Sequence, residues 1–145
     1  MAELQRRFPD LAIDFQFSEA RAEVTGDAYW LRLAVRELLD NAIRFRPSPS
    51  GRIDLSISSS STSWVVSVLD DGFGIGTADQ DQLFERFARI ETDENQQQVG
   101  MGIGLYMVRE VARAHGGRVT ASSRAGAGSE FVLELPRVSG VSRDR

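Results

Sequence analysis

Two sets of glycines at alternate positions constrain this chain more than any other feature. The first set, in Asp70-Asp-Gly-Phe-Gly-Ile-Gly76, directly follows a run of β-forming residues. The second set, Gly100-Met-Gly-Ile-Gly104, precedes a stretch with apolar residues at helical spacing. Glycine has no side chain, so both loops allow close approach to the backbone. The sequence therefore predicts one strand-to-loop junction and one loop-to-helix junction, both suited to contact with a ligand.

The apolar pattern on either side of these loops predicts the secondary structure. Alternating apolar residues indicate strands, and apolar residues three or four apart indicate helices. We expect strands at 11–17, 52–58, 63–69, 118–123 and 129–135, and helices at about 27–45, 79–87 and from the second glycine set to 114. Strands and helices do not alternate regularly, so an α+β fold, a two-layer α/β sandwich, is favoured over a doubly wound fold.

Length and composition exclude several classes of function. With 145 residues we expect a single domain, 1–145, with a core at about 11–136 and a tail at 137–145. All 17 basic residues are arginine, so a Walker-type phosphate loop, which needs lysine, is excluded. A net charge of −4 without a basic stripe argues against a nucleic-acid partner. We also expect no membrane contact, because long apolar runs are absent from the sequence.

Three polar residues of the first helix share one stripe beside its apolar face. They are Glu37, Asn41 and Arg44. The amide oxygen of Asn41 suits Mg²⁺, which takes oxygen ligands and is often shared with substrate phosphates. Arg44 suits a phosphate oxygen, and Glu37 suits the orientation or deprotonation of an attacking group. The alternative is a solvated helix face, and the helix alone favours that alternative.

The two glycine loops carry the other candidate residues. Asp70 ends a strand, and its ionised carboxylate only accepts hydrogen bonds, which suits the amino group of adenine. Gly72 and Gly74 would let a purine ring pack on bare backbone. The second set precedes a helix whose free amides favour phosphates. An ordinary Asp-Gly turn and a flexible loop remain the alternatives when each loop is taken separately.

Taken in order, four segments resemble the N, G1, F and G2 boxes of sensor histidine kinases. The segments are Glu37-x-x-x-Asn41, Asp70-x-Gly72-x-Gly74, Leu83-Phe-Glu-Arg-Phe87 and Gly100-x-Gly102-x-Gly104-Leu105. The resemblance covers about residues 12–136, including a Gly126-Ala-Gly-Ser-Glu-Phe131 stretch before the last strand. It implies the GHKL ATP-binding fold, shared with type II topoisomerases and heat-shock chaperone ATPases. That fold has a mixed sheet of about five strands with three helices on one face.

The resemblance also implies ligands and roles. The ligands are ATP or ADP with Mg²⁺, with Asn41 binding the metal and Asp70 contacting adenine. Catalytic roles fall to Glu37, Asn41 and Arg89. Nucleotide contacts fall to Asn41, Arg44, Phe45, Asp70, Gly72, Gly74, Ile75, Phe87, Gly100, Gly102, Ile103, Gly104 and Leu105. Asp71 stands where asparagine is frequent in the family. Its charge is expected either to tighten the binding of Mg²⁺ or to weaken the binding of nucleotide.

The phosphoacceptor expected for this family is not in the chain. In sensor histidine kinases it lies on a separate helical hairpin, and none precedes Leu11. His115 is predicted to lie at a helix C-terminus, where histidine commonly meets the last carbonyls, so we assign it a structural role. We therefore expect a cytoplasmic catalytic domain that transfers the γ-phosphoryl group of ATP to a histidine on a dimerisation domain outside this chain.

Two other functions stay open at this point. A sensor kinase is expected to have a response regulator as its downstream partner. The first alternative is a free-standing GHKL serine kinase of the anti-sigma-factor type, whose chain length would match. The Leu83-Phe-Glu-Arg-Phe87 segment favours the histidine kinase over that alternative. A nucleotide-binding regulatory module without transfer is the third function, and the intact Glu37, Asn41 and glycine sets argue against it.

Overall fold

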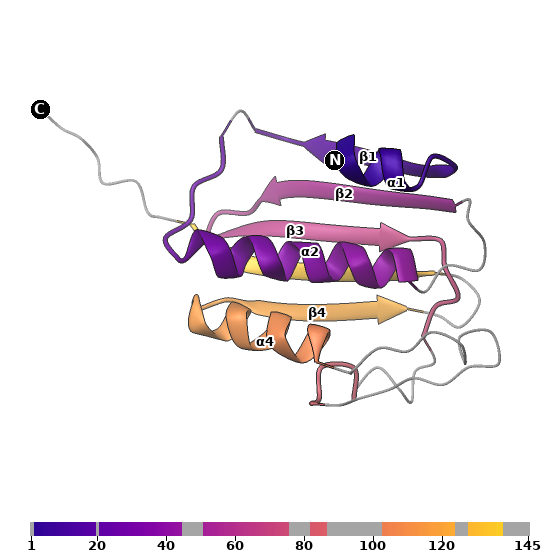
Figure 1. The fold of residues 1–145 in the computed structure, drawn as a ribbon. Helices are drawn as coiled ribbons and strands as arrows, with labels where there is room; N and C mark the ends of the chain where they lie inside the picture. Colours follow the sequence, from indigo (N-terminus) through magenta and orange to yellow (C-terminus); the bar gives the residue numbers. More distant parts are fainter. Residues whose placement is uncertain are drawn as a thin grey trace, which may run out of the picture.

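One mixed sheet organises the part of the chain that the computed structural model describes, residues 2–19, 21–44, 51–75, 82–86, 103–123 and 128–137. Its strand order is β1-β2-β3-β5-β4 (Figure 1). β1 and β2 are parallel, and the other neighbouring pairs are antiparallel. The strands are β1 Leu11–Phe17, β2 Gly51–Ser59, β3 Ser63–Asp70, β4 Arg118–Ser123 and β5 Ser129–Pro136.

Two helices, α2 (Ala28–Arg44) and α4 (Gly104–Ala114), lie against one face of this sheet, and a short helix, α1 (Ala2–Arg7), lies beside β1 (Figure 1). The predicted α+β fold with five strands and three helices is thus confirmed, although one helix is not the one expected. Residues 82–86 of the expected 79–87 helix form turns. α1 was not predicted because six residues are too few to show helical periodicity. Among the described residues, no helix is long and apolar enough to cross a membrane.

The core lies between the two long helices and the sheet. Leu38 of α2 and Val108 of α4 are fully buried, as are Val68 of β3 and Phe131 and Leu133 of β5. This agrees with the apolar arc predicted for α2, whereas Glu37 and Asn41 are half-buried beside it and Arg44 is exposed. The core therefore holds α2, α4, β3 and β5 as one packed unit, and these are the elements that carry most of the candidate residues.

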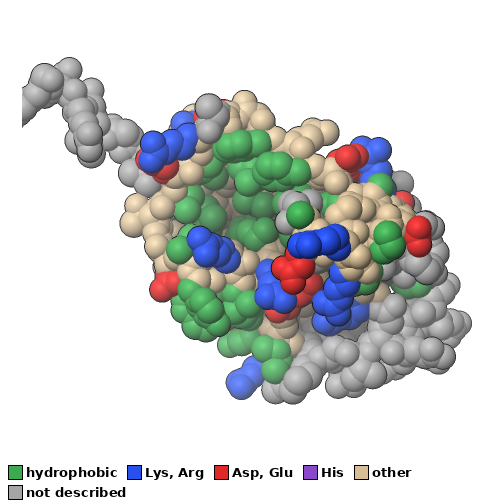
Figure 2. Space-filling model, turned by 45° about the horizontal axis from the view of Figure 1, so that its top comes forward, with side chains coloured by type: hydrophobic (Ala, Val, Ile, Leu, Met, Phe, Trp, Pro, Cys, Tyr) green, Lys and Arg blue, Asp and Glu red, His purple; other side chains and the backbone are tan. Residues whose placement is uncertain are grey.

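Strand β1 is less buried than its alternating pattern predicts. Leu11 is buried, but Phe15 and Phe17 are 52% and 39% exposed. β1 is an edge strand, and α1 contacts its beginning through a hydrogen bond from Gln5 Nε2 to the Leu11 carbonyl at 2.9 Å. Figure 2, in which the β1 side comes forward, shows hydrophobic side chains gathered in a hollow of the surface. Alternation thus indicated which residues share a face, and tertiary packing decided how far that face is covered.

Candidate functional site

The ends of two helices and one strand that carry candidate residues lie at the same end of the molecule. They are the C-terminal end of α2, the C-terminal end of β3 and the N-terminal end of α4 (Figure 1). Asn41 and Arg44 lie on α2, Asp70 ends β3 and Gly104 begins α4. The fold therefore brings together the segments that the sequence placed in separate boxes.

Asp70 is a buried carboxylate with well-defined hydrogen-bond partners. Its side chain is 6% exposed. Oδ1 accepts a hydrogen bond from the Gly72 amide at 2.9 Å, and Oδ2 accepts one from the Ser129 hydroxyl at 2.8 Å. Burial raises the pKa of Asp70 above its ordinary value, while the bonds from Ser129 and Gly72 oppose that rise. The result is an oriented, acceptor-rich group at the junction between strand and glycine loop.

Two residues that support Asp70 were not assigned a role from the sequence. Ser129, which is itself buried, pairs with Asp70 across β3 and β5. Gly128 has a φ of +81°, and a Cβ there would lie 2.2 Å from the Asp70 carbonyl oxygen. Both belong to the Gly126-Ala-Gly-Ser-Glu-Phe131 stretch, so a signal was present in the sequence. Its meaning depended on strand register, which the stretch alone does not reveal.

If Asp70 contacts adenine as the resemblance implies, replacing Ser129 with alanine should weaken ATP binding about fivefold, because one neutral hydrogen bond contributes about 1 kcal/mol and here it orients Asp70. Titration calorimetry of the two proteins with ATP measures this. Ser67→Ala is a suitable control, since Ser67 lies on the same strand as Asp70 but donates its hydrogen bond to Glu130. Equal affinity in wild type and Ser129→Ala would show that Asp70 is held without this hydroxyl.

The first glycine loop is tied to the sheet by a second serine. Ser123 Oγ accepts a hydrogen bond from the Ile75 amide at 2.6 Å and donates one to the Gly128 carbonyl at 2.8 Å. Gly74 has a φ of +70°, a conformation that L side chains rarely adopt. The loop therefore follows a defined path from Asp70 to Ile75, as a surface that receives a ligand requires.

Asp71 has a partner on the neighbouring strand. Its Oδ1 accepts a hydrogen bond from the Arg52 amide at 3.0 Å, and it lies close to Gly51. This contact connects the end of β3 with the start of β2. The sequence left open how the Asp71 carboxylate affects the metal site. In the structure this carboxylate has a hydrogen bond to β2.

Glu37 lies against the beginning of α4. A Cβ at Gly104 would lie 2.6 Å from Glu37 Oε2, so the Glu37 carboxylate occupies the space that a side chain at position 104 would take. The N-cap residue of α4, Ile103, makes no capping hydrogen bond through its side chain. Amides at a helix N-terminus attract anions, and phosphate is a common occupant. This end of α4 therefore suits phosphate oxygens, with a carboxylate and the amide of Asn41 on the adjacent helix.

The segment before Phe87 is anchored to both the core and α4. Leu83 is buried, and the Phe84 ring meets Phe131 edge to face with centroids 6.3 Å apart. Glu85 forms an ion pair with Arg109 of α4 at 3.2 Å. These contacts fix residues 82–86 beside the site. Phe45, Phe87, Arg89, Gly100 and Gly102, which were also assigned roles, lie outside the described residues.

Sequence comparison identifies a family for most of the chain. Residues 26–139 match the family model described as histidine kinase-, DNA gyrase B-, and HSP90-like ATPase. The sensor histidine kinase RppB of Synechocystis sp. is 31% identical over 142 residues, covering 94% of this chain and 31% of the relative. The probable sensor histidine kinase TcrY of Mycobacterium tuberculosis is 40% identical over 113 residues, covering 78% and 23%. The chain thus spans less than a third of the length of these relatives.

Structural comparison agrees with the sequence. The mycobacterial sensor histidine kinase MprB superposes with a TM-score of 0.80 at 26% identity, covering 94% of this chain and 88% of that one. Full-length ShkA, solved in complex with AMPPNP, superposes with a TM-score of 0.79 at 28% identity, covering 96% of this chain and 29% of that one. The likeness extends over nearly the whole chain.

Proposed function

Since the chain belongs to the histidine kinase-, DNA gyrase B- and HSP90-like ATPase family, we propose that it is the ATP-binding catalytic domain of a sensor histidine kinase. The observation that supports this most directly is the buried Asp70 carboxylate, held by Gly72 and Ser129 where β3 meets the glycine loop. A second support is that the C-terminal end of α2, which carries Asn41 and Arg44, lies at the same end of the molecule as the N-terminus of α4 (Figure 1).

In this proposal the described residues divide the work on ATP. Asp70 accepts a hydrogen bond from the adenine amino group, and the backbone from Gly72 to Ile75 packs against the ring. The amides at the start of α4 and the Arg44 guanidinium bind phosphate oxygens. Glu37 orients the attacking histidine or accepts its proton. The proposed roles of Phe45, Phe87, Arg89, Gly100 and Gly102 rest on the family resemblance.

Asn41 is the residue that would hold Mg²⁺. The half-buried position of Asn41 and its amide oxygen fit a metal that is shared with phosphate oxygens. When bound, the metal neutralises charge on the phosphates during transfer. Positioning and charge neutralisation by Asn41, Arg44 and the α4 amides are then the main contributions of the protein.

The rest of the reaction lies with partners outside this chain. The γ-phosphoryl group would pass from ATP to the unprotonated ring nitrogen of a histidine on a dimerisation domain of the same protein, releasing ADP, and the imidazole would then lose the proton of its other ring nitrogen. The phosphoryl group would then pass to a response regulator. We place this domain in the cytoplasm, where ATP and response regulators are found.

The proposed function is tested with γ-³²P-labelled ATP and Mg²⁺. The chain alone should bind ATP yet acquire no acid-labile label, because His115 is engaged at a helix end. When a polypeptide that carries the histidine hairpin is added, that polypeptide should acquire acid-labile label, and an Asn41→Ala domain should transfer far less. Acid-stable label on an added protein would instead indicate a serine kinase. Binding without transfer to a competent hairpin would indicate a regulatory module.

A further inference from the structure

His115 connects the two helices of the candidate site at the opposite end of the molecule. It follows α4, and its Nδ1 lies 2.7 Å from the Val111 carbonyl oxygen. Its Nε2 accepts a hydrogen bond from the backbone amide of Asp27 at 3.0 Å. Because an amide only donates, Nε2 carries no proton, and the proton on Nδ1 is donated to Val111. The bonded arrangement therefore requires the neutral imidazole.

The residue that binds His115 lies directly before α2. Asp27 Oδ1 accepts hydrogen bonds from the Tyr29 and Trp30 amides at 2.9 and 3.2 Å, and the Asp27 carbonyl accepts one from Leu31 at 3.0 Å. These are the bonds of a helix N-cap. His115 is thus bonded to the N-terminal cap of α2 although 88 residues separate it from Asp27 in sequence.

The chain leaves room for this contact at Gly26. A Cβ at this position would lie 2.2 Å from Cδ2 of the His115 ring. Any side chain there would displace the imidazole or the start of α2. The contact between the two helices therefore depends on glycine at 26 as well as on histidine at 115.

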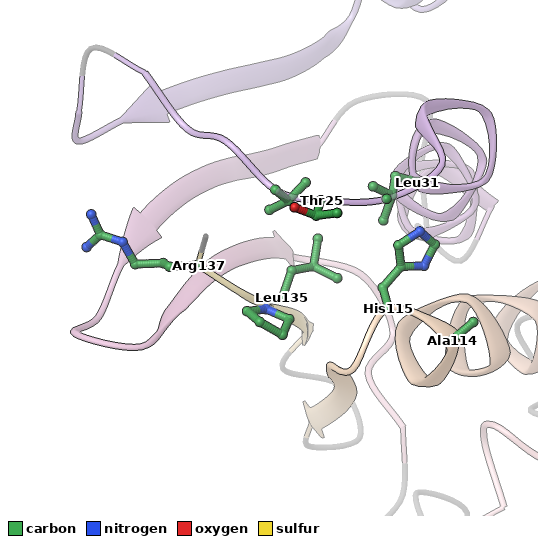
Figure 3. Close-up of a pocket in the computed structure, with 9 residues that line it drawn as sticks. Thr25, Leu31, Ala114, His115, Leu135 and Arg137 are labelled. Carbon is green, nitrogen blue, oxygen red and sulfur yellow. The ribbon is translucent and has the colours of Figure 1, made fainter. Parts of the chain in front are cut away.

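A pocket of about 460 Å³ borders the same contact. In Figure 3 the His115 ring extends from the end of α4 toward the segment that leads into α2, beside Thr25, Leu31 and Leu135. Interiors that hold an element by packing alone are filled to high density. Here part of the boundary next to the start of α2 is open, so packing alone does not fill the space around the contact between His115 and Asp27.

We propose that His115 is a positioning residue for nucleotide binding, which sets where the N-terminal end of α2 lies relative to α4. The proposal rests on the proposed ATP site. α2 and α4 run in opposite directions and pack against each other in the core. Outside that packing, His115 is bonded to Asp27 at one end, and Glu37 lies beside Gly104 nearer the other. A helix moves largely as a rigid body, so a shift at Asp27 is carried to Glu37 and Asn41. Small misplacements of groups that position a substrate have large effects.

Two substitutions separate the acceptor atom from the bulk of the ring. His115→Gln keeps an acceptor oxygen near the position of Nε2, whereas His115→Phe keeps a ring and removes the acceptor. Gly26→Ala disturbs the same contact from the other side without changing His115. Circular dichroism and melting temperature show whether each variant is folded, and affinity for AMPPNP with Mg²⁺ is measured at pH 8.

At pH 8 we expect His115→Phe and Gly26→Ala to bind about tenfold more weakly than wild type, and His115→Gln to bind within about threefold of it. This order identifies the acceptor atom, because loss of the ring alone would weaken binding by His115→Gln rather than by His115→Phe.

The chain has one histidine, so ¹⁵N signals of its ring report the tautomer without ambiguity. We expect the Nδ1-protonated form in wild type at pH 8. Equal affinities for folded wild type, His115→Phe and Gly26→Ala would overturn the positioning role, as would the other tautomer. If wild type itself did not bind the nucleotide, the proposed function would fail instead, so the two failures are distinguishable.

Discussion

Replacing Asp70 with asparagine should weaken ATP binding about 100-fold, since a buried site built for one hydrogen-bond pattern discriminates strongly against another. Asparagine has one acceptor oxygen, and the Gly72 amide already uses an oxygen of this side chain. The amide group that replaces the second oxygen is a donor, as is the adenine amino group. Titration calorimetry with ATP and Mg²⁺ measures the loss.

Asp71→Asn is the matched control for this experiment. It makes the same chemical change one residue later, on a side chain that accepts its hydrogen bond from Arg52 of β2. ATP affinity should change by less than about threefold, while stability falls by roughly 1 kcal/mol or less through the weaker contact with β2. Equal losses of affinity in the two variants would remove Asp70 from the adenine site.

The Asp70→Asn protein should be more stable than wild type at neutral pH. Burial raises the pKa of Asp70, so the contribution of this group to stability is fully present below its unfolded pKa and is lost as pH rises through the folded pKa. Asparagine carries no charge and avoids that loss. Urea unfolding should therefore show an advantage for Asp70→Asn at pH 7 that shrinks toward pH 3. A variant that is more stable but does not bind would also rule out misfolding as the cause of lost affinity.

Gly128→Ala should destabilise the fold by about 3 kcal/mol, through left-handed strain and a collision with the backbone. Gly128 has a φ of +81°, and its Cβ would lie 2.2 Å from the Asp70 carbonyl oxygen. The backbone of β3 cannot move aside as easily as the end of a flexible side chain can. The collision would therefore displace Asp70. Chemical denaturation measures the stability, and calorimetry should show lost ATP binding in the protein that remains folded.

Gly116→Ala separates the strain from the collision. Gly116 has a similar φ of +74°, but the nearest atom to its Cβ, Pro136 Cγ, is at an ordinary contact distance of 3.5 Å. This variant should lose about 1 kcal/mol from strain alone and should keep its affinity for ATP. Equal destabilisation at 116 and 128 would show that β5 can move away from Asp70 at little cost.

Much of the fold follows from the sequence because its signals are local. Alternation and helical spacing predicted the five strands and both long helices nearly to their ends. Such patterns arise from the geometry of a single strand or helix. The helix predicted at 79–87 was wrong at 82–86, where the segment forms turns. Leu83 is buried and Phe84 is half-buried against the core, so tertiary contacts rather than a helix explain the apolar residues there.

By itself the sequence determined the family and the candidate residues Asp70, Asn41 and Glu37, because the residue types and their order along the chain carry that information. Tertiary structure alone decided what holds those residues. Ser129 reaches Asp70 across 59 residues, and His115 reaches Asp27 across 88. Each contact depends on strand register or on how two helices pack. Neither leaves a periodic trace in the chain, so only the folded arrangement reveals it.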